Sequence, residues 1–179
     1  MVPEAPLEDA GHGLVPQGEG WYVLNARETR WLESRLGAFC NFEGEPRFSP
    51  LGINLNVLQP GEPTAMYHWE RDQEDFLVLG GEALLVAEGE ERQLRQWDLV
   101  HCPAGTKQVI VGAGEGSCVV LAVGARINSS RDDWGGYAVD EAAIRHDAGV
   151  ERETTSTEEA YARFAEARAA RYRRGWLGD

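Results

Sequence analysis

The sequence predicts an all-β domain, either a sandwich or a barrel of short strands, and three observations support this fold class. Between about residue 50 and residue 123, short apolar stretches alternate with turns that contain glycine or proline. No long helical stretch separates these strands, which argues against a parallel sheet built from βαβ units. No internal repeat of 20–50 residues is present, so repeat architectures are also excluded.

The expected strands follow one another closely along this central region. Pro60-Gly61 closes the first, Gly80-Gly81 closes the third, and Pro103 to Gly105 separates two later ones. In order, the expected strands cover residues 51–59, 65–70, 75–79, 83–87, 92–94, 99–102, 108–111 and 118–123.

The flanking segments have a different character. Residues 1–19 are rich in proline and glycine and predict an extended N-terminal arm. Asn25 and Glu28 form a capping pattern, and apolar residues then recur at helical spacing, so a short helix is expected over residues 26–36.

A second helix is expected in the C-terminal segment. Ser156 to Glu159 forms a capping box, an apolar stripe follows, and Gly175 is a suitable stop. The expected organisation is an arm over 1–19, one domain over 20–150 with its barrel core at about 50–123, and a helical extension over 151–179.

The composition excludes several classes of partner. The 179 residues include 17 Lys and Arg and 30 Asp and Glu, which gives a net charge of −13. Such acidity argues against nucleic acid and against an anionic membrane surface as partners. No apolar run approaches the length of about 20 residues that a membrane span needs. Three cysteines without a CxxC pair, and no secretory signal pattern, predict a cytoplasmic protein.

The first chemically informative motif surrounds His68. Residues two apart on a strand share a face, so His68 and Glu70 should point the same way. Glu74 follows a tight turn, and a hairpin would bring it opposite this pair. One imidazole and two carboxylates that converge in this way would form part of a divalent-metal site.

The second motif is Pro103-x-Gly105-x-x-Gln108, in which a turn leads into a strand that begins with a polar side chain. Gln108 could complete the site, either as a ligand or as a hydrogen-bonding group in the pocket. His101 lies just before this turn, and it is either a further pocket residue or a packing histidine on its strand.

The order of these motifs resembles the cupin superfamily, whose members are small jelly-roll barrels made from a double-stranded β-helix. Gly61, His68-x-Glu70, Glu74 and Gly81 stand where the family has its first motif, and Pro103-x-Gly105-x-x-Gln108 stands for the second. The resemblance covers about residues 50–123. By position it implies the metal ligands His68, Glu70, Glu74 and Gln108, with Glu70 and Gln108 replacing family histidines.

The resemblance implies a divalent metal ion in the barrel mouth, with Mn, Fe, Ni or Zn as candidates. A small-molecule enzyme of the dioxygenase, isomerase or decarboxylase type is the corresponding function, which would make the protein a metal-dependent oxidoreductase or isomerase. The alternative is a non-catalytic cupin that binds a small molecule and has lost its metal, with His68 hydrogen-bonded in a dry barrel. A third alternative is a metal-free epimerase-like enzyme, and Glu70 and Glu74 could also act as an acid–base pair with separated pKa values.

A homodimer is expected from the apolar side chains that face away from the site. Tyr67 and Trp69 alternate with His68 and Glu70, so they lie on the opposite face of the expected strand. They are interpreted as core or subunit-interface residues, and the N-terminal arm could also be shared between subunits. The expected partners are therefore a small-molecule ligand and a second copy of the chain.

Overall fold

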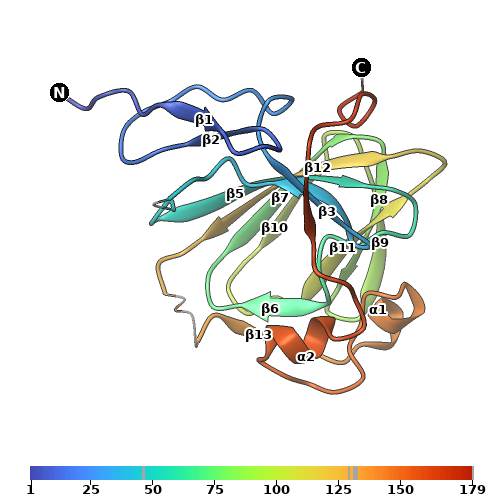
Figure 1. Cartoon of the computed structure of the whole chain (residues 1–179). Coiled ribbons are helices and arrows are strands. Elements are labelled where there is room, and N and C mark those ends of the chain that lie inside the picture. Colours follow the sequence, from blue (N-terminus) through green and yellow to red (C-terminus); the bar gives the residue numbers. More distant parts are fainter. Residues whose placement is uncertain (46, 129, 131–132, 179) are drawn as a thin grey trace.

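Two antiparallel sheets that face each other form the body of the protein (Figure 1). The structure is a computed structural model that describes residues 1–45, 47–128, 130 and 133–178. The larger sheet has the strand order β10-β7-β12-β5-β4-β3-β14, and the smaller has the order β13-β6-β11-β8-β9. A separate two-stranded sheet, β1-β2, lies near the N-terminus.

The strands are β1 (Leu7–Asp9), β2 (Leu14–Pro16), β3 (Trp31–Ser34), β4 (Gly37–Cys40), β5 (Leu51–Leu58), β6 (His68–Glu70), β7 (Glu74–Gly80), β8 (Glu82–Ala87), β9 (Glu90–Arg95), β10 (Leu99–Cys102), β11 (Gln108–Ala113), β12 (Cys118–Ala125), β13 (Gly135–Tyr137) and β14 (Arg168–Ala170). The helices are α1 (Glu141–Arg145) and α2 (Thr157–Tyr161). Each of the eight strands expected between residues 51 and 123 has a counterpart in β5–β12. The all-β prediction is therefore confirmed, and within the described ranges neither helix is long enough to cross a membrane.

The main core lies between the two sheets. Phe76, Val78 and Val120 of the larger sheet pack against Leu85 and Ile110 of the smaller one, and all five are buried. This arrangement removes the alternating apolar side chains of both sheets from water, which is the main driving force for the fold. The inner faces leave a hollow at one end, where polar side chains replace apolar ones, and the candidate site lies there.

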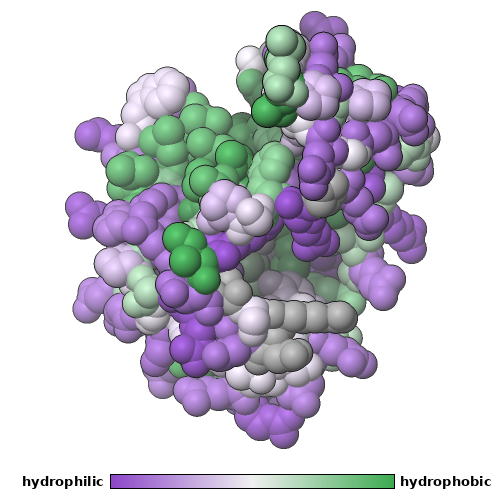
Figure 2. Space-filling view, turned by 90° about the vertical axis from the view of Figure 1, so that its left-hand side faces the viewer, coloured by the Kyte–Doolittle hydropathy of each residue, from purple (hydrophilic) through white to green (hydrophobic). Residues whose placement is uncertain are grey.

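The outer faces of both sheets are also covered. Residues 138–148, including α1, pack on Tyr67 and Val109 of the smaller sheet. Tyr172 and Trp176 pack on Trp31 of the larger sheet. Strands covered on both faces read as continuous apolar runs, which explains the sequence Gln-Val-Ile-Val in β11. In the face shown by Figure 2, hydrophobic residues gather in the upper part and hydrophilic ones dominate elsewhere.

The expected helix over residues 26–36 is wrong. Asn25 does form a cap, since its Oδ1 accepts a hydrogen bond from the Arg27 amide, but only one turn follows. The chain then forms β3 and β4, which a two-residue turn connects, and Gly37 adopts the positive φ of 97° at this turn. Trp31 explains the difference, because its fully buried ring is held between the larger sheet and the C-terminal segment. Tertiary packing therefore outweighs the local helical spacing.

The single long C-terminal helix is also wrong. The N-cap is present, with Ser156 Oγ accepting from the Glu159 amide at 3.3 Å, but the Ser156 amide donates to Thr154 Oγ1 instead of to Glu159, and α2 ends at Tyr161. The later residues form β14, which pairs with the edge strand β3. An unpaired β3 would expose a row of backbone donors and acceptors, so sheet pairing competes successfully with helix formation.

The N-terminal arm is more ordered than the sequence indicates. Its residues form the β1–β2 hairpin, and the backbone of Ala5 donates to the Trp21 carbonyl oxygen at 2.9 Å. Arg171 from the C-terminal segment contacts Asp9 through an ion pair of 3.1 Å. The β1–β2 hairpin and the C-terminal segment therefore contact each other, and both lie in the upper part of Figure 1.

Candidate metal centre

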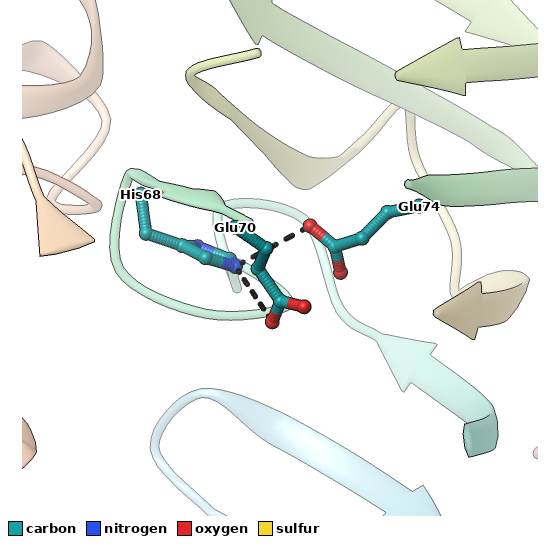
Figure 3. A group of neighbouring side chains, drawn as sticks. All are labelled: His68, Glu70 and Glu74. Carbon is teal, nitrogen blue, oxygen red and sulfur yellow. Dashed lines mark ion pairs between the residues drawn. The ribbon is translucent and has the colours of Figure 1, made fainter. Parts of the chain in front are cut away.

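Three side chains converge at the open end of the space between the sheets. His68 and Glu70 come from β6 in the smaller sheet, and Glu74 is the first residue of β7 in the larger sheet. His68 Nε2 lies 3.8 Å from Glu70 Oε1 and 3.6 Å from Glu74 Oε2 (Figure 3). The expected hairpin between β6 and β7 is wrong, because the two strands belong to different sheets and the site joins them.

The connection between these strands is fixed by a buried carboxylate. Asp72 is 4% exposed and accepts hydrogen bonds from the backbone amides of Ile127 and Asn128 at 3.1 and 2.9 Å. Arg71 donates its own amide to the Trp134 carbonyl oxygen at 2.8 Å. These bonds set the crossover from one sheet to the other, so the separation of Glu70 and Glu74 is held by the fold.

The orientation of the His68 ring leaves one nitrogen available to a ligand. His68 Nδ1 lies 2.7 Å from the Met66 carbonyl oxygen, and a carbonyl can only accept, so Nδ1 carries the proton. Nε2 then has a lone pair that faces the two carboxylates. A second hydrogen bond that fixes the tautomer in this way is usual for histidines that bind metals.

Gln108 completes the group from the neighbouring strand. It pairs directly with His68 across the β11–β6 ladder, and its Nε2 donates to Glu74 Oε2 at 2.9 Å. The amide oxygen Oε1 is buried, and it has no hydrogen-bond partner among the described residues. A buried acceptor without a partner is costly, so this oxygen is available to a ligand in the pocket.

Burial changes the protonation behaviour of all three groups. It lowers the pKa of His68, although the Glu70 carboxylate and the Met66 carbonyl act in the opposite direction. Burial raises the pKa of Glu70 to about 7, and the charge of Glu74 adds to this rise. It raises the pKa of Glu74 to about 7 as well, against the effect of the Gln108 hydrogen bond. Two neighbouring carboxylates in this partly buried site are therefore unfavourable in their charged forms, and a bound cation would stabilise those charges.

The donor set fits a divalent ion. One ligand atom from each of His68, Glu70 and Glu74 lies within 4.8 Å of the others. Ligands about 2.1 Å from an ion stand roughly 3.0–3.4 Å apart, so small side-chain rotations would close the site. One nitrogen with carboxylate and amide oxygens suits Mn, Fe(II), Ni or Zn better than a metal that requires thiolates.

The pocket around these residues has aromatic and polar walls that the motifs did not indicate. The Trp134 ring lies 5.9 Å from the His68 ring, between centroids, and Tyr137 lies 6.1 Å from it. The Tyr161 hydroxyl accepts a hydrogen bond from the Met66 amide at 3.1 Å. The cavity has a volume of about 390 Å³. Its remaining wall residues include Asn54, Asn56, Thr64, Ala122 and Thr157.

Some of these wall residues had a sequence signal that was interpreted differently. Tyr161 belongs to the apolar stripe that predicted a helix, whereas Trp134 and Tyr137 lie beyond the two motifs in the sequence. Asn54 and Asn56 gave no distinct signal, although polar residues two apart in an apolar strand share one face.

His101 lies outside this pocket. It is on the edge strand β10, its side chain is 55% exposed, and its Nδ1 is 2.6 Å from Asp75 Oδ1. Cys102, the next residue, points into the core instead. The alternation of side chains along β10 thus directs His101 to the surface.

Comparison with known families agrees with this arrangement. A sequence profile of the cupin domain matches residues 54–124, which span most of β5 to β12 and include all four candidate ligands. Residues 54–124 therefore form a cupin domain. The segments outside the match are the N-terminal region through β4 and the region after residue 124, which supplies Trp134, Tyr137 and Tyr161 to the cupin pocket.

Three solved structures that align with part of this chain are the following. A Cupin 2 conserved barrel domain protein from Salinispora arenicola aligns at 19% identity and a TM-score of 0.49, covering 60% of this chain and 89% of that one. A cupin-superfamily sugar phosphate isomerase from Silicibacter pomeroyi aligns at 24% identity and a TM-score of 0.46, covering 59% of this chain and 71% of that one. A proposed sugar phosphate isomerase from Acidithiobacillus ferrooxidans aligns at 27% identity and a TM-score of 0.42. The alignment covers 44% of this chain and about half, 52%, of that one. No curated protein matches the sequence.

Proposed function

We propose that this cupin binds a divalent metal ion through His68, Glu70 and Glu74, with Gln108 Oε1 as a further ligand, and acts as an enzyme on a small molecule. The observation that carries the proposal is the free lone pair of His68 Nε2, which faces two partly buried carboxylates. The bound ion would supply Lewis-acid or redox chemistry to a substrate oxygen, as in the dioxygenases, isomerases and decarboxylases of the family.

The protein side chains around the site have separate tasks. Gln108 holds the Glu74 carboxylate through a hydrogen bond, and Met66 holds the His68 ring. The Tyr137 hydroxyl lines the same cavity and lies 3.5 Å from Thr157 Oγ1. Since burial raises the pKa of Tyr137, this hydroxyl stays protonated at neutral pH, and a substrate oxygen could replace Thr157 Oγ1 as the acceptor of its hydrogen bond.

Elemental analysis tests this proposal directly. The protein would be purified without chelator or nickel resin, beside His68→Ala, Glu74→Ala and the control His101→Ala. His101 also contacts a carboxylate, but it lies on the surface, so it controls for adventitious binding. The proposal expects about one ion per chain in the wild type and in the control, and loss of the ion in both site variants. Equal metal content in all four proteins, or none in any of them even after metal is added, would contradict it.

The alternative is a non-catalytic cupin that binds a small molecule without metal. The raised pKa values of Glu70 and Glu74 favour it, because a metal-free pocket near pH 7 would hold protonated carboxyl groups that can donate hydrogen bonds. Metal-free protein that refuses added metal but is stabilised by a small molecule in a thermal shift assay would support this alternative.

The homodimer and the cytoplasmic location stay predictions. Tyr67 does not contribute to a dimer interface, because it is 1% exposed and packs in the core of its own chain. Light scattering at high micromolar concentration tests the dimer, and a monomer under these conditions would exclude it.

A further inference from the structure

A second cavity opens from the candidate metal centre. It has a volume of about 650 Å³, next to the 390 Å³ of the pocket around His68. The two cavities share six wall residues, which are Asn54, Asn56, Thr64, Tyr137, Thr157 and Tyr161. Because these residues line both spaces, a ligand held at the metal centre can extend into the second cavity, which we name the side chamber.

The distinctive walls of the side chamber are apolar. On one side are Leu36, Ala38 and Phe39, from the β3–β4 hairpin. On the other side are Ala162, Phe164 and Ala165, which follow α2. None of these apolar residues lies within the region that matches the cupin profile, so the apolar walls of the side chamber are formed by segments outside the cupin core.

Aromatic packing holds the α2 side of the chamber in place. The rings of Tyr161 and Phe164 lie 6.4 Å apart between centroids, and Tyr161 packs edge-on against Tyr137 at 5.7 Å. The Arg163 guanidinium covers the Phe164 ring at 4.9 Å, while its Nη2 donates to the Asp147 carbonyl oxygen. The chamber wall is therefore continuous with the packed core and requires little ordering when a ligand enters.

The charge of the joined cavities selects against an anionic substrate. Glu70 and Glu74 line the metal pocket, and Glu158 and Glu166 line the side chamber. The wall residues of both cavities, within the described part of the chain, include no lysine or arginine. A phosphate group is normally held by such cations, and here it would meet carboxylates instead.

We propose that the substrate is an unphosphorylated amphipathic molecule with an oxygen-bearing head and an apolar body of about one or two rings. The head would reach the centre formed by His68, Glu70 and Glu74, and the body would occupy the side chamber between Leu36 and Phe164. This inference rests on the proposed metal site and names the substrate class of that site.

Three probes with the same head and different tails test the substrate class. Acetohydroxamic acid carries a methyl group, 2-naphthohydroxamic acid a two-ring apolar body, and phosphoglycolohydroxamic acid a phosphate. The full-length protein would be loaded with Ni²⁺, the metal content measured, and each probe titrated by calorimetry. We expect the naphthyl probe to bind at least tenfold more tightly than the methyl probe, and the phosphate probe to bind no more tightly than the methyl probe.

A pair of variants tests whether the preference for the naphthyl probe arises in the side chamber. Leu36→Asp places a charge in the apolar chamber wall, and Leu99→Asp makes the same change at an exposed position on β10. In Leu36→Asp the naphthyl preference should fall at least fivefold, while the affinity for the methyl probe changes less than twofold. Leu99→Asp should leave both values as in the wild type.

The outcomes separate this inference from the proposed function. A metal-loaded protein that binds the naphthyl and methyl probes equally overturns the inference alone. So does a naphthyl preference that survives in Leu36→Asp, or a phosphate probe that binds tenfold more tightly than the methyl probe. Protein that takes up no metal overturns the proposed function, and with it this inference.

Discussion

Glu74→Gln should stabilise the metal-free protein while it removes the metal site. The substitution replaces a buried carboxylate by an amide of nearly the same shape. Burial raises the pKa of Glu74 from 4.5 to about 7, which corresponds to a penalty of about 3 kcal/mol for ionising this group in the folded protein. The amide carries no charge at any pH, so the variant avoids this penalty.

The sign of the pH dependence follows from proton linkage. Between pH 4.5 and about 7 the folded protein keeps a proton on Glu74 that the unfolded chain has released. The free energy of unfolding of the wild type therefore falls as the pH rises through this range, and it levels off above pH 7. His68 has the opposite shift, but it is present in both proteins and largely cancels in the difference between them.

Urea unfolding in the presence of EDTA at pH 4.5, 6 and 8 measures this effect. At pH 8 the variant should exceed the wild type by about 2–3 kcal/mol, after allowance for the coupling to Glu70, and at pH 4.5 the two should be nearly equal. In a protein of this size the gain corresponds to a rise in Tm of roughly 4–12 °C. Glu90→Gln, an exposed substitution on β9, controls for the change in net charge.

The result that would refute the reasoning is a difference that does not depend on pH. A variant less stable than the wild type at pH 8 would also refute it, since the lost interaction with Gln108 would then outweigh the burial penalty. Adding Ni²⁺ provides an internal check, because it should stabilise the wild type and leave Glu74→Gln unchanged.

Three further predictions follow from the same structure. Metal affinity should fall steeply below pH 7, by as much as about 100-fold per pH unit when the metal must displace two carboxyl protons. Calorimetry at pH 6 and pH 8 would detect this fall. Equal affinities at both pH values would argue against Glu70 and Glu74 as ligands. Gln108→Leu should raise the pKa of Glu74 further, because the hydrogen bond from Gln108 that lowers this pKa is lost. An NMR titration of the Glu74 carboxyl carbon should show the change. An unaltered titration would mean that this hydrogen bond is absent in solution. Trp31→Ala should cost about 3–5 kcal/mol in urea unfolding, because the fully buried ring joins β3 to the C-terminal segment. The arginines of residues 168–174 are already exposed, and release of their backbone should speed trypsin cleavage there. A slow cleavage rate like that of the wild type would show that β14 holds the segment without the ring.

The sequence predicts the cupin core well because the determinants of that region are local. Glycine and proline mark the strand ends between residues 51 and 123, and side chains alternate regularly within the strands. The spacing of His68 and Glu70 places them on one face of β6 whatever the surroundings are, because successive side chains on a strand point in opposite directions.

The flanking segments are predicted poorly because their conformation depends on distant partners. Residues 31–36 and 162–174 both carry helical spacing, and the structure pairs parts of them with each other as β3 and β14. Trp31 and Tyr172 each belong to one of the two patterns that predicted helices, and they pack on one another across 141 positions of the sequence. Local propensity does not predict such a contact, because the contact contributes free energy only when the chain has folded.

The candidate site, like the fold, was determined partly by the sequence and partly by the tertiary structure. The sequence by itself determined the all-β class, the cupin motifs, and the identity of His68, Glu70, Glu74 and Gln108 as polar groups at their positions. Only the tertiary structure decided that Glu74 reaches His68 from the opposite sheet, that His101 faces solvent, and that the side chamber opens beside the site. The physical reason is that alternation along a strand fixes the face of a side chain, whereas the packing of two sheets fixes which faces meet.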